Sequence, residues 1–166
     1  RDAQESRGLG DVYKRQQEVR IMFKKILVPV DGSETAWRAL NNALEIGKKF
    51  ESEILVVNVI QPYNNAALLA VPLDHATINQ GNSELEKVGD KVLELAKEMV
   101  GSYPHKVEYD MEVGHPSERI IALSKKVEAD AIVLGSRGLS GIAEFFLGSV
   151  SSKVSQYATV PVLIVK

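Results

Sequence analysis

The chain has 166 residues, 45% hydrophobic and 25% charged, a composition typical of one globular domain with a buried core. A formal net charge of -2 argues against a nucleic-acid-binding protein, which would present a basic surface. The absence of cysteine excludes disulfides, thiolate catalysis and Cys-ligated zinc and suits a reducing cytoplasm, where we expect the protein, and no apolar run is long enough to predict a membrane span.

The N-terminal residues 1–16, RDAQESRGLGDVYKRQ, show no helical or strand periodicity and lack the apolar core of a secretory signal. They resemble a translated adapter segment, and Met22 lies where a natural start would, just before the first apolar run. We therefore predict that residues 1–21 are a non-native or disordered leader and that residues 22–166 form the domain. A genuine N-terminal arm is the alternative.

From Lys24 onward, short apolar runs alternate with segments of helical periodicity. The run Ile26–Val30 predicts a strand buried on both faces, because it is nearly continuous in hydrophobic residues. A helix is expected over Glu34–Phe50, where small and apolar residues recur every three or four positions. Either Asp31 or Ser33 would cap this helix.

The run Ile54–Ile60 predicts a second buried strand. Residues 61–82, with two prolines and a glycine, are interpreted as a long loop that includes one helical turn and either covers a site or moves. The box formed by Ser83 and Glu86 predicts that the next helix begins at Ser83 and runs to Val100. The apolar face expected on that helix comprises Leu85, Val88, Val92, Leu95, Ala96 and Met99.

The second half of the chain continues the alternation. Val107–Val113 alternates apolar with acidic residues, which is typical of a half-exposed strand at a sheet edge. Pro116 suits the first turn of a helix that would run to Glu128, and Ala131–Leu134 predicts a buried strand. A helix over Ser149–Ala158 and a strand over Pro161–Val165 complete the chain.

This order of elements predicts a doubly wound α/β fold of the Rossmann-like kind. Strands that alternate with helices pair in parallel through right-handed crossovers, so we expect a single five-stranded parallel sheet with helices on both faces. Ligands of such sheets bind at the carboxyl ends of the strands, where the winding direction reverses.

A glycine-rich segment, GSRGLSGIAEFFLGS over residues 135–149, joins the fourth strand to the last helix. Its glycines would let the backbone approach an anion and supply positive φ for a concave nest of amides, and the helix N-terminus adds unpaired N–H groups. Ser149 can give its N–H and its hydroxyl to a phosphate oxygen, whereas Arg137 either adds a charged contact or faces solvent. The alternative is that the glycines only turn a long loop. Neither the P-loop motif nor the dinucleotide fingerprint is present.

The spacing Gly135-x2-Gly138-x9-Gly148-Ser149 resembles the ATP-binding signature of the universal stress protein family. The opening KILVPVDGSE from Lys25, the turn Gly114-His115-Pro116 and the closing VPVLIV from Val160 are similar to other conserved parts of that family. The resemblance covers residues 22–166 and implies an adenine nucleotide alpha hydrolase-like fold that binds ATP.

The resemblance also implies a set of site residues. Backbone amides would surround the ribose and phosphates, a carboxylate would approach the ribose, a phosphate or bound Mg²⁺, and apolar residues would form the floor and the adenine contact. The amides would be those of Gly135, Gly138, Gly148, Ser149 and Val150, and the carboxylate would be that of Asp31. Pro29, Val30 and Leu134 would lie below the nucleotide, Val59 would contact the adenine, and Arg137 is an added candidate. A homodimer through Pro161–Val165 is implied as well, and a further protein partner is left open.

Three functions follow as hypotheses. The first is a binding and signalling module in which ATP occupancy sets a dimer or partner surface. The second is an enzyme that hydrolyses ATP slowly or phosphorylates Ser136, Ser140 or Ser149, although no convincing base is present. The third is a nucleotide-free dimeric module. Asp31 has an alternative role in turn and cap chemistry, and the three histidines lack metal-ligand spacing.

Overall fold

A parallel sheet of five strands forms the centre of the computed structural model, which describes residues 23–62, 75–139 and 147–166. The strands lie in the order β3-β2-β1-β4-β5. Their bounds are β1 Lys25–Pro29, β2 Glu53–Ile60, β3 Val107–Val113, β4 Ala131–Gly135 and β5 Val162–Val165.

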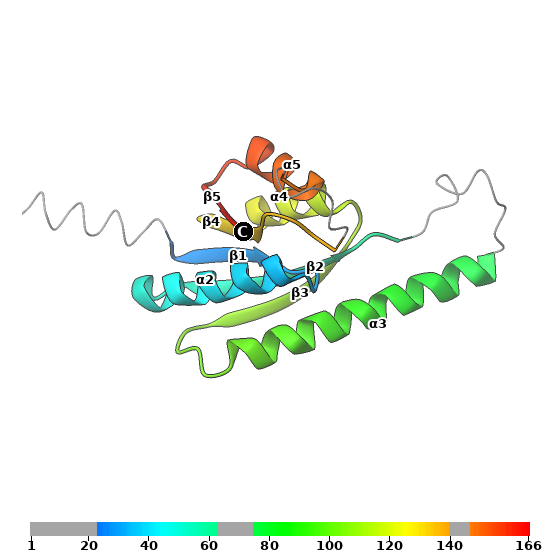
Figure 1. Cartoon of the computed structure of the whole chain (residues 1–166), viewed down its shortest axis with the longest axis horizontal. Helices are drawn as coiled ribbons and strands as arrows, with labels where there is room; N and C mark the ends of the chain where they lie inside the picture. The colour runs from blue at the N-terminus through cyan, green and yellow to red at the C-terminus, as the bar shows by residue number, and fades with distance from the viewer. Residues whose placement is uncertain (1–22, 63–74, 140–146) are drawn as a thin grey trace, which may run out of the picture.

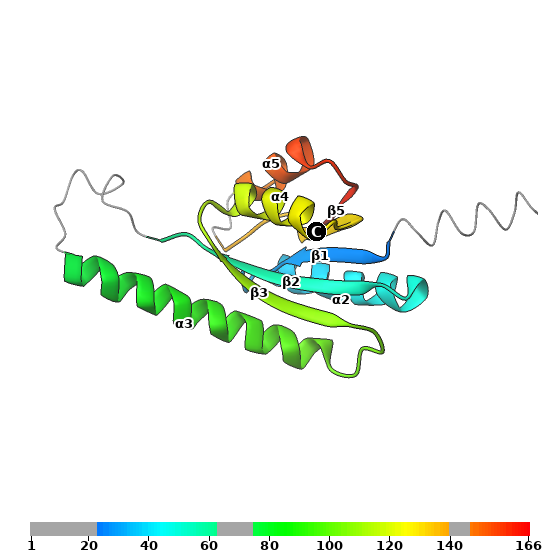
Figure 2. The ribbon, with the colours of Figure 1, turned by 180° about the vertical axis from the view of Figure 1, so that it is seen from behind.

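Helices cover both faces of this sheet, as Figures 1 and 2 show. α2 (Glu34–Phe50) and α3 (His75–Val100) pack on one face, and α4 (Pro116–Lys126) and α5 (Ser149–Tyr157) pack on the other. This arrangement confirms the predicted doubly wound α/β fold. Element ends agree with the sequence-based bounds to within two residues, apart from the start of α3. None of the helices in the described ranges is both long and apolar enough to cross a bilayer.

The central strands are hydrophobic on both sides because each side meets a separate core. Ile26 and Val28 of β1 pack toward α2 and α3, whereas Leu27, between them, packs toward α4 and α5. All three side chains are fully buried. β3 is a half-exposed edge strand, as its alternation predicted.

The start of α2 resolves which residue caps it. The Ser33 side chain accepts a hydrogen bond from the Ala36 N–H at 3.3 Å, so Ser33 is the N-cap. Asp31 acts one step earlier, since its Oδ1 accepts from the N–H of Ser33 at 2.9 Å and from its hydroxyl at 2.6 Å. The sequence had left these two residues as alternatives.

The predicted loop over residues 61–82 is wrong in its second part, because α3 already begins at His75. Ser83 therefore lies inside the helix, and the capping box predicted with Glu86 does not start it. A capping pattern is a local signal, and a helix overrides it when the preceding turn is already helical. Residues 63–74 of the predicted loop lie outside the described ranges.

The buried face of α3 is also rotated from the predicted one. Val92 and Ala96 are buried as predicted, but Val88, Leu95 and Met99 are exposed, and Gly89 and Leu93 are buried beside the first two residues. Gly89 explains the rotation, because a Cβ at this position would lie 2.8 Å from Oδ1 of Asn58 on β2. The helix thus turns Gly89 toward the sheet, together with Val92, Leu93 and Ala96.

Candidate functional site

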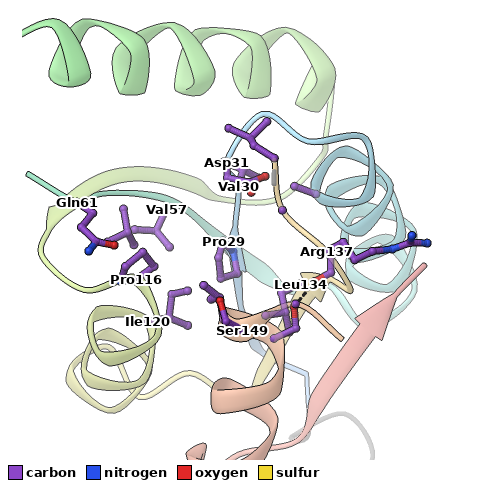
Figure 3. Close-up of a pocket in the computed structure, with 18 residues that line it drawn as sticks. Pro29, Val30, Asp31, Val57, Gln61, Pro116, Ile120, Leu134, Arg137 and Ser149 are labelled. Atoms are coloured by element: carbon purple, nitrogen blue, oxygen red, sulfur yellow. Dashed lines mark hydrogen bonds between the residues drawn. The ribbon is translucent and has the colours of Figure 1, made fainter. Parts of the chain in front are cut away.

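A cavity of about 430 Å³ opens at the carboxyl ends of β1, β2 and β4 (Figure 3). The chain winds outward from β1 to β2 and β3 in one direction, and from β4 to β5 in the other. The cavity therefore lies at the switch point of the sheet, where ligands of open α/β folds bind. Its volume falls within the range of small-molecule sites.

All the site residues predicted from the sequence line this cavity. They are Pro29, Val30, Asp31, Val59, Leu134, Gly135, Arg137, Gly138, Gly148, Ser149 and Val150. Seven further residues complete the wall: Ala36, Val57, Gln61, Pro116, Ile120, Leu139 and Ser151. Gln61 directly follows β2, so the strand-end rule could have found it, whereas Ile120 and Ser151 lie within helices and carry no local signal.

The two sides of the cavity differ in polarity. Figure 3 shows Val57, Pro116, Ile120 and Gln61 together on one side. Apart from the Gln61 carboxamide, the side chains of these residues are apolar. The other side holds Asp31 and the glycine segment, where backbone amides and a carboxylate are exposed to the cavity.

Several hydrogen bonds hold the described parts of the glycine segment in place. The Ser136 N–H donates to Val165 O at 2.7 Å, and the Gly148 N–H donates to Ser136 O at 2.8 Å. The Thr35 hydroxyl donates to Arg137 O at 2.5 Å, and the Ser151 hydroxyl donates to Gly135 O at 2.8 Å. The segment is thus tied to β5, α2 and α5 at once.

Two glycines of the segment are needed for space. A Cβ on Gly135 would lie 2.8 Å from the Ala36 backbone nitrogen, and a Cβ on Gly138 would lie 2.6 Å from Asp31 Oδ2. Neither residue has positive φ, and Gly148 has a φ of -60°. None of these three glycines therefore uses the positive φ that was predicted. Close packing requires glycine at 135 and 138, whereas a Cβ on Gly148 would lie no nearer than 3.4 Å to its neighbours. Gly141 lies outside the described residues.

The N-terminus of α5 supplies backbone donors to the cavity. Within the described ranges, the N–H groups of Ser149, Val150 and Ser151 have no recorded acceptor, as is usual for the first turn of a helix. Gly148 differs, because its N–H is already paired with Ser136 O. The prediction that the Gly148 amide contacts a phosphate is corrected accordingly.

Asp31 presents one oxygen to the turn and the other to the cavity. Oδ1 accepts both hydrogen bonds from Ser33, whereas Oδ2 has no recorded partner in the described part of the chain and lies beside Gly138. The carboxylate therefore combines the turn role with a free oxygen in the site. No group of three or more His, Cys, Asp or Glu side chains placed to hold a metal ion occurs among the described residues.

Arg137 contributes to the wall through its backbone. Its carbonyl accepts the Thr35 hydroxyl, and Figure 3 shows the side chain directed away from the cavity. Of the two orientations considered from the sequence, the one toward solvent is found.

The end of β1 is held by β2. The Val30 N–H donates to Val57 O at 2.8 Å, and Val30 O accepts from Asn58 Nδ2 at 2.7 Å. Asn58 is buried, and its side-chain amide joins β2 to the end of β1 that leads to Asp31.

Comparison with known proteins places these features in a family. The model of the universal stress protein family matches residues 22–166. Universal stress protein YxiE of Bacillus subtilis is 37% identical over 150 residues, which cover 87% of this chain and 100% of that protein.

Solved structures show the same fold. The structure of MJ0577, a Methanocaldococcus jannaschii protein, aligns with a TM-score of 0.71 at 31% identity, covering 87% of this chain and 96% of the other. A universal stress protein from Archaeoglobus fulgidus, solved in complex with dAMP, aligns with a TM-score of 0.63 at 23% identity, covering 87% and 99%.

Proposed function

This chain belongs to the universal stress protein family, and from that premise we propose that it binds ATP and acts as a signalling module. The observation that carries the proposal is the cavity at the sheet switch point, with an apolar side and, on the opposite wall, amides that have no recorded acceptor among the residues the structure describes. A nucleotide has the same division, since its base is flat and largely apolar and its phosphates are anionic.

The phosphates would meet the N-terminus of α5. The N–H groups of Ser149 and Val150 there have no recorded acceptor within the described ranges, and the positive end of the helix dipole favours an anion. Gly135 and Gly138 would let the phosphate chain pass close to the backbone. The base would lie against Val59, with Pro29, Val30 and Leu134 below the nucleotide.

The free oxygen of Asp31 suits a ribose hydroxyl or a Mg²⁺ ion carried by the phosphates. A single carboxylate is enough for the second role, because Mg²⁺ usually keeps several waters and takes further ligands from the phosphates. The Archaeoglobus fulgidus relative holds dAMP, but at 23% identity that likeness is one of fold, so ATP is proposed here from the cavity of this chain. A cytoplasmic location remains part of the proposal, since a Cys-free chain suits a reducing compartment.

Two observations argue against phosphoryl transfer as the main role. The Arg137 guanidinium points away from the cavity, although a cation near the terminal phosphate would be needed. Ser136, one of the serines considered as an acceptor, is only 3% exposed and does not line the cavity. The signalling reading is therefore preferred over an enzyme.

The outer edge of β5 is the surface we propose for a homodimer. Ile132 N–H donates to Pro161 O and Ser136 N–H to Val165 O, so these residues of the terminal strand face β4. Because alternate residues of a strand direct their backbone groups to opposite sides, Val162 and Ile164 present theirs at the open edge. An apolar edge without a partner favours pairing with another strand.

The opposite edge of the sheet is less suited to pairing. Along β3, Glu108, Asp110 and Glu112 alternate with apolar residues, and the Met111 N–H is already bonded to Asp110 Oδ1 at 2.9 Å. Charged residues and an occupied donor protect an edge strand from pairing. This contrast between the two edges supports β5 as the dimer strand.

A chain of backbone hydrogen bonds would connect the nucleotide to that edge. Val165 O at the end of β5 accepts the Ser136 N–H, and Ser136 O accepts the N–H of Gly148 directly before α5. A phosphate bound at the start of α5 would thus act on residues that are bonded to the terminal strand. This contact is the route by which occupancy would alter the dimer surface.

The proposal is tested by ATP titration calorimetry on Gly138→Ala, with Gly81→Ala in α3 as the matched control. The new Cβ at position 138 would displace the Asp31 carboxylate from its bonds to Ser33, so we expect ATP affinity to fall about tenfold. The control should bind ATP like the parent protein, because it places the same methyl group on a helix away from the cavity. A folded parent protein that fails to bind ATP at millimolar concentration would refute the proposal.

A further inference from the structure

Gln61 is the polar exception on the apolar side of the cavity. The lining residues around it, Val57, Val59, Pro116 and Ile120, have apolar side chains. Within the described part of the chain, no hydrogen bond is recorded for the Gln61 carboxamide. A donor and an acceptor are thus available where the rest of the wall offers only dispersion contacts.

The backbone at this position is held from both sides. Immediately before it, Ile60 O accepts the N–H of Gly114 at 2.8 Å, which joins the ends of β2 and β3. Immediately after it, Pro62 restricts the Gln61 backbone to extended conformations. The fold therefore fixes the backbone from which the exposed Gln61 side chain projects, and Figure 3 shows its carboxamide near Pro116 at the cavity wall.

We propose that Gln61 reads the edge of the bound base and selects adenine over guanine. The inference rests on the proposed nucleotide site and goes beyond it by naming the residue that sets base specificity. A base held against Val59 and between the apolar walls would turn a polar edge toward Gln61, which lies on the same side of the cavity.

The chemistry of the carboxamide matches adenine. Its carbonyl accepts one hydrogen bond and its amide donates another, side by side and in one plane. Adenine presents the complementary pair, an amino donor at position 6 beside the acceptor N7, and this pairing is the usual one between glutamine and adenine. Guanine offers two acceptors, O6 and N7, on the same edge, so the Gln61 carbonyl would face an oxygen and lose its hydrogen bond.

A double-mutant cycle between protein and ligand isolates this contact. The proteins are the parent chain and Gln61→Leu, and the ligands are ATP and purine riboside triphosphate, which lacks the 6-amino group. Gln156→Leu, on the exposed surface of α5, is the matched control. Dissociation constants are measured by calorimetry, and thermal melting checks that each variant is folded.

If the inference is right, the parent chain binds ATP about three- to tenfold more tightly than the analogue, as expected for one neutral hydrogen bond. In Gln61→Leu this preference falls to about one, and the preference for ATP over GTP narrows as well. The control variant keeps both preferences of the parent chain.

Two other outcomes have separate meanings. If Gln61→Leu weakens ATP and the analogue by the same factor, or leaves both unchanged, base reading by Gln61 is overturned while the nucleotide site stands. If the folded parent chain binds none of the nucleotides, the proposed function itself fails and this inference fails with it.

Discussion

Asn58 shows how one side chain can prepare a site that it does not line. Its amide is buried beneath α3 and donates to Val30 O, while the Val30 N–H is held by Val57 O. The backbone N–H and carbonyl of Val30, directly before Asp31, are therefore both held by β2. A buried carbonyl that loses its donor costs about 1–3 kcal/mol, so the strand end would relax if the amide were removed.

Replacing Asn58 with leucine should raise the dissociation constant for ATP about three- to tenfold, because Val30 and Asp31 would no longer be held in register. The measurement is ATP titration beside Asn42→Leu. Asn42 also donates to a backbone carbonyl, that of Arg38, but on the exposed face of α2. Equal affinities in the two variants would mean that Asn58 serves only the core.

At the scale of the element, Gly89 determines which face of α3 packs against the sheet. Gly89 lies so close to β2 and β3 that a Cβ would contact Asn58 and Ile60 of β2 and Met111 of β3 within 3.1 Å. This close approach decides the rotation of the helix and leaves Val88 60% exposed, whereas Val92 is 8% exposed. Hydrophobic periodicity alone had assigned both valines to the buried face.

A matched pair of truncations tests this rotation. Val92→Ala should lower the free energy of unfolding by about 1–2.5 kcal/mol, because it removes buried methyl groups and leaves a cavity. Val88→Ala should change it by less than about 0.5 kcal/mol, as is usual at exposed helix positions. Urea denaturation gives both values. Equal losses would restore the face predicted from the sequence.

At the scale of the whole molecule, the two sheet edges have opposite characters. β5 is uncharged and open along its outer side, and β3 carries acidic residues with one outward donor already bonded. The β5 edge is joined to the glycine segment through Ser136. If both proposals hold, ATP and the second subunit must influence each other's affinity by the same factor, because binding linkage is reciprocal.

Val162→Pro should convert the proposed dimer into a monomer without unfolding it. The substitution removes an N–H that faces the open edge, at the first position of the strand, where proline is tolerated. Val107→Pro makes the same change at the first position of the opposite edge strand and should leave the oligomeric state unaltered.

Sedimentation velocity with and without ATP gives both the oligomeric state and the linkage. A parent chain that stays monomeric at micromolar concentration, or a dimer that Val162→Pro leaves intact, would contradict pairing through β5. A dimer whose dissociation constant does not change with ATP would contradict only the proposed coupling through Ser136, and pairing through β5 would stand.

Local sequence patterns determined most of the elements. The buried strands follow from continuous apolar runs, the start of α2 from a cap at Asp31 or Ser33, and the edge position of β3 from its alternation. These signals depend on residues a few positions apart, so no tertiary information was needed to read them. The site residues Val59 and Leu134 came from the family resemblance, and the parallel order of the strands explains why they share one end of the sheet with Asp31.

The tertiary structure decided what depends on contacts between distant segments. It turned Gly89 toward Asn58 and so rotated α3, it paired the Gly148 amide with Ser136, and it brought Ile120 of α4 to the cavity. It also directed the Arg137 side chain away from the site. Each outcome is set by steric fit or hydrogen bonding between elements that are remote in sequence. A pattern within one segment does not indicate which distant segment will contact it.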